Sequence, residues 1–197
     1  MPLTFPAHQG LIFPVVHRWP GYFDALALSV GAAMPDISDS VLGFLLNGYF
    51  KQWYGHALIG IFAFDLPGGL LITWLIGVLA ARFLPHTSSN SHIATVRSMV
   101  LSRRTRSSLW SFSVLVGILS HLSFDLISHD TNLLLYPWYE NARFPEWWYT
   151  TWFKVRPLPM FGKSYSVGVF TIIWGLLSLL GVFWFVRFLI PKRKNKV

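Results

Sequence analysis

Histidine and aspartate side chains recur every four residues within one apolar stretch of this sequence. The segment Ser120–His129 reads SHLSFDLISH and contains His121, Asp125 and His129. On an α-helix this spacing places the three side chains along one face. Ionisable groups inside an apolar helix are costly unless a metal, a hydrogen bond or water partners them. The pattern therefore predicts either a metal centre or a hydrogen-bonded cluster that ties helices together.

Three further residues extend this predicted centre along the chain. His8 lies in a proline-rich segment and could equally be exposed, Asp36 follows Pro35, and His56 follows Gly55. Neutral imidazole and carboxylate suit a hydrolytic zinc ion, and a bridging carboxylate allows two metals. We therefore expect one or two divalent ions, with zinc favoured. The predicted metal ligands are His8, Asp36, His56, His121, Asp125 and His129.

Most of these candidates also have a structural explanation that needs no metal. His121 and Asp125 could hydrogen-bond each other, and Asp36 and His56 could cap helices. His129 could reach the membrane interface from the end of its helix. These alternatives stay open at the level of sequence.

Other catalytic chemistries find little support. The chain has no cysteine, which excludes thiolate metal sites and cysteine nucleophiles. It also has no glycine-rich phosphate loop, no Gly-x-Ser-x-Gly and no His-Glu-x-x-His. A metal-activated water is therefore the chemistry that the residues favour.

The composition indicates an integral membrane protein. Of 197 residues, 53% are hydrophobic and 12% are charged, and the mean hydropathy is +0.48. Soluble domains carry about 25% charged residues. Aromatic residues make up 17% and include ten Trp, as expected of interfacial anchors. We expect an all-α, multi-pass helical bundle that forms a single membrane domain over residues 1–197.

Four apolar stretches supply the expected helices, with three to four membrane crossings. The first is broken at Met34-Pro35-Asp36, because proline disrupts a helix interior and aspartate is costly at membrane depth. It could cross fully or form a re-entrant pair, and the break favours the re-entrant form. The stretches are 22–50, 56–84, 108–129 and 165–190. Between and after them we expect a basic linker at 85–106, an aromatic-rich outer loop at 130–164 and a basic tail at 191–197.

The positive charge predicts the orientation in the membrane. The net charge is +8, and Lys and Arg gather in the 85–106 linker and the C-terminal tail. Cytoplasmic segments are enriched in these residues, so we expect both to lie inside, at a bacterial plasma membrane. His56, His121 and Asp125 then fall on the outer side. Membrane lipid is the expected partner, and nucleic acid is not expected.

The order of these motifs resembles that of a known group of bacterial proteins. Pro2-Leu3-Thr4-Phe5-Pro6-Ala7-His8 is followed by a helix ending in Pro35-Asp36, then by His56, and then by His121-x-x-x-Asp125 with His129. This order resembles the small multi-pass proteins described as membrane-bound metal-dependent hydrolases, and a related uncharacterised integral membrane family. That group is distantly similar to zinc-dependent phospholipase C and the S1 and P1 nucleases, which are all-helical enzymes that cleave phosphoric esters.

The resemblance implies a ligand set and an activity. Asp36, His56, His121 and Asp125 would hold one metal, and His8 with shared Asp125 a second. His129 would belong to a third site, but no His follows it to complete that site. The expected activity is hydrolysis of a phosphoric ester, such as a lipid phosphoester, by a metal-activated water. The alternative is a non-enzymatic membrane protein with a structural metal site or a His/Asp hydrogen-bond cluster. A transporter is disfavoured, because residues 108–119 contain no ionisable side chain to continue a relay.

Overall fold

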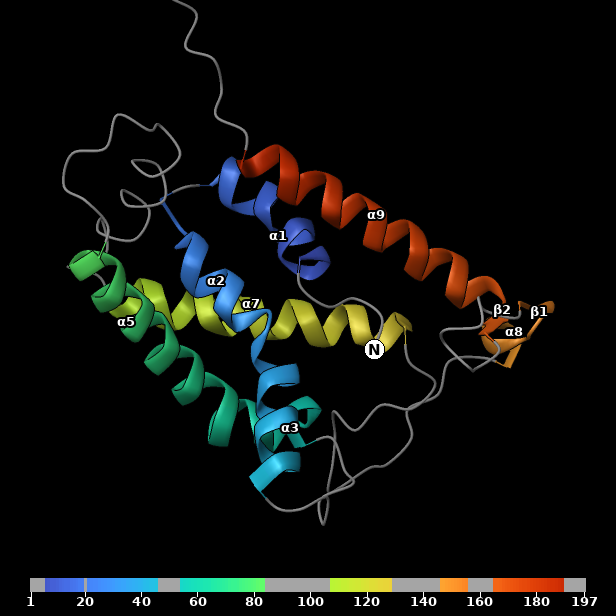
Figure 1. Cartoon of the computed structure of the whole chain (residues 1–197), viewed down its shortest axis with the longest axis horizontal. Coiled ribbons are helices and arrows are strands. Elements are labelled where there is room, and N and C mark those ends of the chain that lie inside the picture. The colour runs from blue at the N-terminus through green and yellow to red at the C-terminus, as the bar shows by residue number, and fades with distance from the viewer. Residues whose placement is uncertain are drawn as a thin grey trace, which may run out of the picture.

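The computed structural model describes residues 6–19, 21–45, 54–83, 107–128, 146–155 and 165–189. Within these ranges the chain is almost entirely helical, as predicted, with one small hairpin (Figure 1). Helices α5 and α7 lie beside each other with the α2–α3 pair packed on them, while α1 and α9 form a second pair. The 85–106 linker and the 191–197 tail lie outside the described residues.

Within the described ranges, two helices are long and apolar enough to cross a membrane. One candidate span, Leu58–Leu79, runs through α4 (Leu58–Gly60), the π-helix η2 (Ile61–Asp65) and most of α5 (Leu66–Phe83). The other, Ser108–Asp125, lies in α7 (Ser107–Ser128). A bent pair of shorter helices brings the number to three if it counts as one span.

The bent pair is the interrupted first stretch. Helix α2 (Ala25–Gly31) and α3 (Met34–Leu45) meet at an angle of 46°. The break lies at Ala32 and Ala33, so Pro35 falls in the first turn of α3, where its missing N–H costs nothing. Asp24 caps α2 by accepting a hydrogen bond from the backbone of Ala27. The sequence thus predicted the break correctly to within a few residues.

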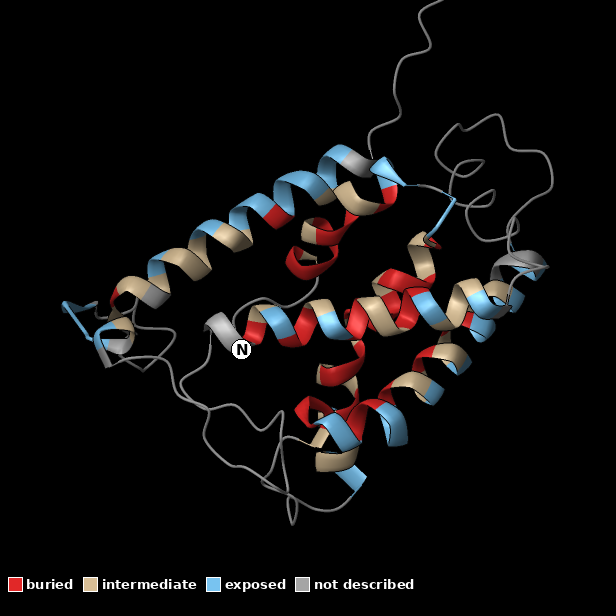
Figure 2. Ribbon diagram, turned by 180° about the vertical axis from the view of Figure 1, so that it is seen from behind, coloured by how far each residue is buried: buried red, intermediate tan, exposed pale blue. Residues whose placement is uncertain are grey.

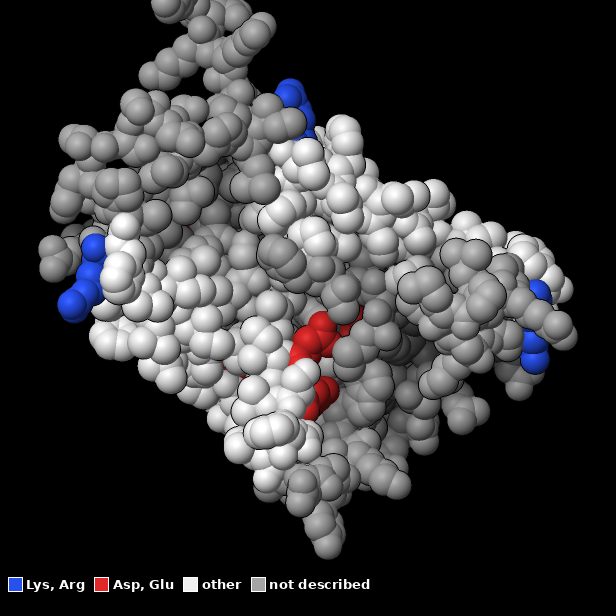
Figure 3. All heavy atoms as spheres, viewed as in Figure 1, with Lys and Arg blue, Asp and Glu red and all other residues white. Residues whose placement is uncertain are grey.

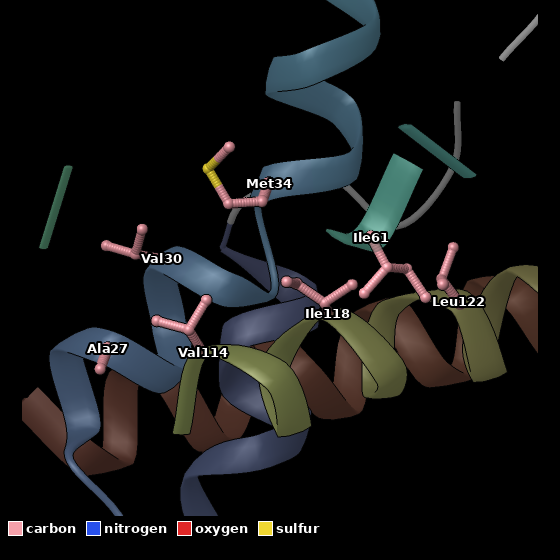
Figure 4. Packing of buried hydrophobic residues seen from close by; sticks show 7 residues of the cluster. All are labelled: Ala27, Val30, Met34, Ile61, Val114, Ile118 and Leu122. Atoms are coloured by element: carbon pink, nitrogen blue, oxygen red, sulfur yellow. The ribbon is translucent and has the colours of Figure 1, made fainter. Parts of the chain in front are cut away.

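Glycines allow α2 and α7 to cross at backbone contact. A Cβ at Gly31 would overlap the carbonyl group of Val114, and one at Gly117 would overlap the carbonyl oxygen of Leu28. Such close approach is possible only without a side chain. The crossing leads into the hydrophobic core (Figure 4), whose buried members are Ala27, Val30, Met34, Ile61, Val114, Ile118 and Leu122.

A second close pair joins the two ends of the chain. Helix α1 (Ala7–Arg18) packs along α9 (Val169–Leu189), with Gly10 and Gly181 in backbone contact and Phe13 stacked on Phe185 at 5.6 Å. Figure 2 shows that α1 is largely buried while α9 keeps an exposed outer face. None of the four apolar stretches expected to form helices included this proline-rich segment. Pro14 nevertheless lies inside α1, which the packing against α9 stabilises.

The predicted aromatic outer loop contains regular structure where it is described. Helix α8 (Glu146–Tyr149) is followed by β1 (Phe153–Val155), which pairs antiparallel with β2 (Tyr165–Val167) just before α9. Trp147 and Trp152 are exposed on this segment. An exposed tryptophan pair beside an apolar helix is consistent with a membrane-interface anchor.

Candidate metal centre

Four of the predicted ligands meet where α3, α7 and the short 3-10 helix η1 (Tyr54–His56) come together. Nε2 of His56 lies 2.9 Å from Oδ2 of Asp125 and 3.3 Å from Nε2 of His121. Asp36 contributes Oδ1, which lies 3.9 Å from Nε2 of either histidine. One ligand atom from each of Asp36, His56 and His121 falls within 4.8 Å of the others. Residues far apart in the sequence are thus close enough to share an ion.

Helix α7 supplies two of these side chains through its turn spacing. His121 and Asp125 are four residues apart, and Nε2 of His121 lies 3.1 Å from Oδ2 of Asp125. The same Asp125 oxygen therefore lies near both imidazoles. The sequence predicted this contact from the helical repeat alone.

The loop before α4 supplies His56, and a second aspartate of α3 holds it in place. Oδ1 of Asp39 accepts a hydrogen bond from the backbone N–H of Gly55 at 2.6 Å, and Oδ2 lies 2.7 Å from Nδ1 of His56. Gly55 packs against the carbonyl oxygen of Pro35, where a Cβ would clash. Sequence reasoning missed Asp39. The signal was its spacing of three residues from Asp36, which puts both carboxylates near one face of α3.

The α2–α7 crossing fixes the orientation of His121. Nδ1 of His121 donates a hydrogen bond to the carbonyl oxygen of Ala32 at 2.7 Å. A carbonyl can only accept, so the proton sits on Nδ1. When His121 is neutral, Nε2 presents a lone pair towards Asp125 and His56. Backbone carbonyls commonly orient metal-binding histidines in this way.

These contacts leave electron-rich atoms facing one another. Nε2 of neutral His121 and Oδ2 of Asp125 are both acceptors at 3.1 Å, and His121 is only 1% exposed. Two acceptors cannot satisfy each other, so this arrangement calls for a neighbouring donor or a cation. The donor set of two imidazoles and two carboxylates suits a zinc or manganese ion.

His56 is the neighbouring donor when no metal is bound. Burial alone would lower its pKa, but hydrogen bonds and charge interactions with Asp125 and Asp39 outweigh burial and raise the pKa of His56 from 6.5 to about 9. Near neutral pH the metal-free histidine is an imidazolium that donates to both carboxylates. A metal at this position must therefore displace a proton.

The remaining predicted ligands differ in their positions. His8 is buried on α1, with its ring 4.2 Å from that of His121 and 5.7 Å from Phe124. It lies next to the centre, and contrary to one alternative it is not exposed. His129 lies outside the described residues.

The members of the centre differ in their exposure. The side chains of His56, His121 and Asp125 are at most 9% exposed, whereas that of Asp36 is 25% exposed. Figure 3 shows acidic atoms reaching the surface together near the middle of one face, while described Lys and Arg atoms lie at the edges. Carboxylates exposed on this face favour the approach of cations.

The described part of the chain defines an all-α protein with two or three helices able to span a membrane and a buried His/Asp centre. The chain belongs to the DUF4184 family, described as a domain of unknown function, whose model matches residues 1–196. No curated protein and no solved structure matches it. The family match brings no activity with it, so any function must be argued from the centre itself.

Proposed function

We propose that this protein is a membrane-embedded, metal-dependent hydrolase of a phosphoric ester, and that its substrate is a lipid phosphoester. The observation that carries the proposal is the convergence of His56, His121, Asp125 and Asp36, with acceptor atoms of His121 and Asp125 facing each other at 3.1 Å. An ion there would be held by Asp36, His56, His121 and Asp125. His8, beside His121, is the candidate for a second ion.

The bound ion would supply a water of lowered pKa and neutralise charge on the phosphoryl oxygens. The residues of the chain prepare this chemistry. Asp125 lies between the two imidazoles, and Ala32 and Asp39 hold the outer nitrogen atoms of the rings. Because Asp36 is the most exposed of the four, the substrate would approach from its side.

The surroundings of the centre favour an amphiphilic substrate. The helical turns that follow His56 expose a group of large apolar side chains at the start of a candidate span. These side chains are Leu58, Ile59, Phe62 and Phe64. A lipid could place its acyl chains against this surface and its phosphate at the centre. The basic segments of the sequence favour an inside location for the C-terminus, which puts the centre on the outer side of a bacterial plasma membrane.

A structural metal site is the second candidate, because the centre joins three elements. An ion bound by α3, η1 and α7 would stabilise the bundle without any turnover. This alternative shares the metal ligands with the hydrolase and differs only in the absence of chemistry.

The test is turnover by the purified protein in detergent with phosphatidate and phosphatidylglycerol as probes. We expect release of phosphate or headgroup that disappears on chelation, returns with zinc or manganese, and is absent in Asp36→Asn. Stoichiometric metal binding with no turnover on either lipid would reject the hydrolase in favour of the structural site.

A further inference from the structure

Two carboxylates one turn apart on α3 approach His56 at opposite ring nitrogen atoms. Asp36 lies 3.9 Å from Nε2, on the side of the centre. Asp39 lies 2.7 Å from Nδ1, on the far side of the ring. Only Asp36 therefore belongs to the face of the imidazole that meets His121 and Asp125.

The Asp39 carboxylate is itself held at both oxygens. Oδ1 accepts the backbone N–H of Gly55 at 2.6 Å, and Oδ2 is the atom that meets His56. Gly55 is fixed by its contact with the carbonyl of Pro35. An ionised carboxylate only accepts, so Asp39 holds a proton on Nδ1 of His56. The proton that metal-free His56 directs from Nε2 towards Asp125, 2.9 Å away, is then the one that a metal would displace.

His121 also carries a proton on Nδ1, but there the acceptor is the backbone carbonyl oxygen of Ala32. A side chain and a carbonyl thus orient the two imidazoles in equivalent ways. We propose that Asp39 is a positioning residue that fixes the tautomer of His56, so that Nε2 is available to a metal. This inference rests on the metal centre of the proposed function, but it does not depend on turnover.

The sharpest test compares Asp39→Asn with Asp39→Ala. In the asparagine variant the amide oxygen must face the Gly55 N–H, because two donors cannot meet at that distance. The amide NH₂ group then donates to Nδ1 and forces the proton of neutral His56 onto Nε2, where it blocks the metal. Alanine removes the acceptor without imposing the wrong tautomer.

We therefore expect Asp39→Asn, although it preserves the shape of the side chain, to weaken zinc binding more than Asp39→Ala. Zinc affinity, measured by competition with a chromophoric chelator, should fall about tenfold in Asp39→Ala and about 100-fold in Asp39→Asn. A residue that served only packing would give the opposite order, since asparagine preserves the shape. Tighter zinc binding by Asp39→Asn than by Asp39→Ala would overturn the proposal.

Imidazole nitrogen NMR of histidine-labelled, metal-free protein provides a readout independent of the metal. In protein that holds neutral His56, wild type and Asp36→Asn should carry the proton on Nδ1, where the contact with Asp39 at 2.7 Å is shorter than the contact of Nε2 with Asp125 at 2.9 Å. In Asp39→Asn the proton should lie on Nε2. His121 should keep its proton on Nδ1 in every variant and so reports on folding. An unchanged His56 tautomer in Asp39→Asn would reject the inference. Failure of wild type to bind zinc would instead reject the proposed function, with the tautomer result still standing.

Discussion

Asp125 and Asp65 are both carboxylates buried in candidate membrane spans, yet their surroundings differ completely. Oδ2 of Asp125 has imidazole nitrogen atoms at 2.9 and 3.1 Å. Asp65, at the end of the π-helix η2, is 0% exposed, and neither of its oxygens makes a hydrogen bond with another described residue. The hydroxyl group of Ser38 on α3 is the nearest polar side chain named for Asp65, and it interacts with the carboxyl group without forming a well-aligned hydrogen bond.

The comparison shows that a buried aspartate is not by itself evidence of a metal site. The candidate centre exists because α2, α3, η1 and α7 bring complementary groups to one point. Asp65 lies close enough to interact electrostatically with His56 and His121, but among the described residues only the Ser38 hydroxyl group faces it, and no histidine nitrogen lies within hydrogen-bond distance. We therefore expect changes in the two regions to have different and separable effects.

The largest effect should come from filling the glycine contact that positions the centre. In Gly117→Ala the new methyl group would overlap the carbonyl oxygen of Leu28 and lie 2.7 Å from the backbone nitrogen of Ala32. We expect a loss of about 3 kcal/mol in the free energy of unfolding, together with weaker metal binding, because Ala32 orients His121. Equilibrium unfolding in mixed micelles would measure the stability.

Gly77→Ala is the matched control for this change. Gly77 lies on α5, and a methyl group added there would meet no atom of the described residues within 4 Å. The substitution should leave stability unchanged or raise it slightly. Equal losses in the two variants would show that the α2–α7 crossing has no special role.

A change in pH should have an intermediate effect, and the quantity it changes is the affinity of the centre for metal. Because the metal must displace the proton of His56, whose pKa is about 9, metal affinity should increase about tenfold for each unit by which pH is raised, until pH reaches about 9. Isothermal titration in buffers of different protonation enthalpy should detect one proton released per ion. A metal affinity that does not change with pH would contradict the assignment of His56 as a ligand.

The stability of the metal-free protein should instead decrease as pH rises. A raised pKa means that the folded state binds the proton more tightly than the unfolded state. The resulting stabilisation is fully present below pH 6.5 and is lost as pH rises through about 9. Thermal unfolding of metal-free protein across this interval would measure it, and a stability that increased with pH would contradict the ion pairs of His56.

The smallest effect should be a gain in stability from Asp65→Asn. The change replaces a fully buried ionisable group, faced only by the Ser38 hydroxyl group among the described residues, with a neutral amide, and it relieves part of the cost of burial, about 1 kcal/mol. Metal content and affinity should stay at wild-type values. A loss of bound metal in this variant would erase the distinction between the two regions and make Asp65 part of the centre.

The sequence was most informative where a single helix carried the pattern. The repeat of four residues predicted the contact of His121 with Asp125, and the proline at position 35 predicted the break between α2 and α3. Apolar length predicted the spans in α5 and α7. Each of these features depends on local periodicity, which a sequence displays directly.

Features that depend on contacts between distant segments could not be predicted in this way. The role of Asp39 depends on where the Tyr54–His56 turn docks, and the orientation of His121 depends on a backbone carbonyl that has no sequence signature. The helix at Ala7–Arg18 forms despite Pro14 because α9 covers it. Tertiary packing overrides local preference at such positions.

The most direct measurement is the metal content of purified protein by inductively coupled plasma mass spectrometry. Wild type, Asp125→Ala, His56→Ala and Asp65→Asn would be compared at matched folding. We predict stoichiometric divalent metal in wild type and Asp65→Asn, and its loss in the other two variants. A wild-type protein that binds neither zinc nor manganese, even after reconstitution with excess ion, would contradict the metal centre and return its residues to a hydrogen-bonded cluster that ties the helices together.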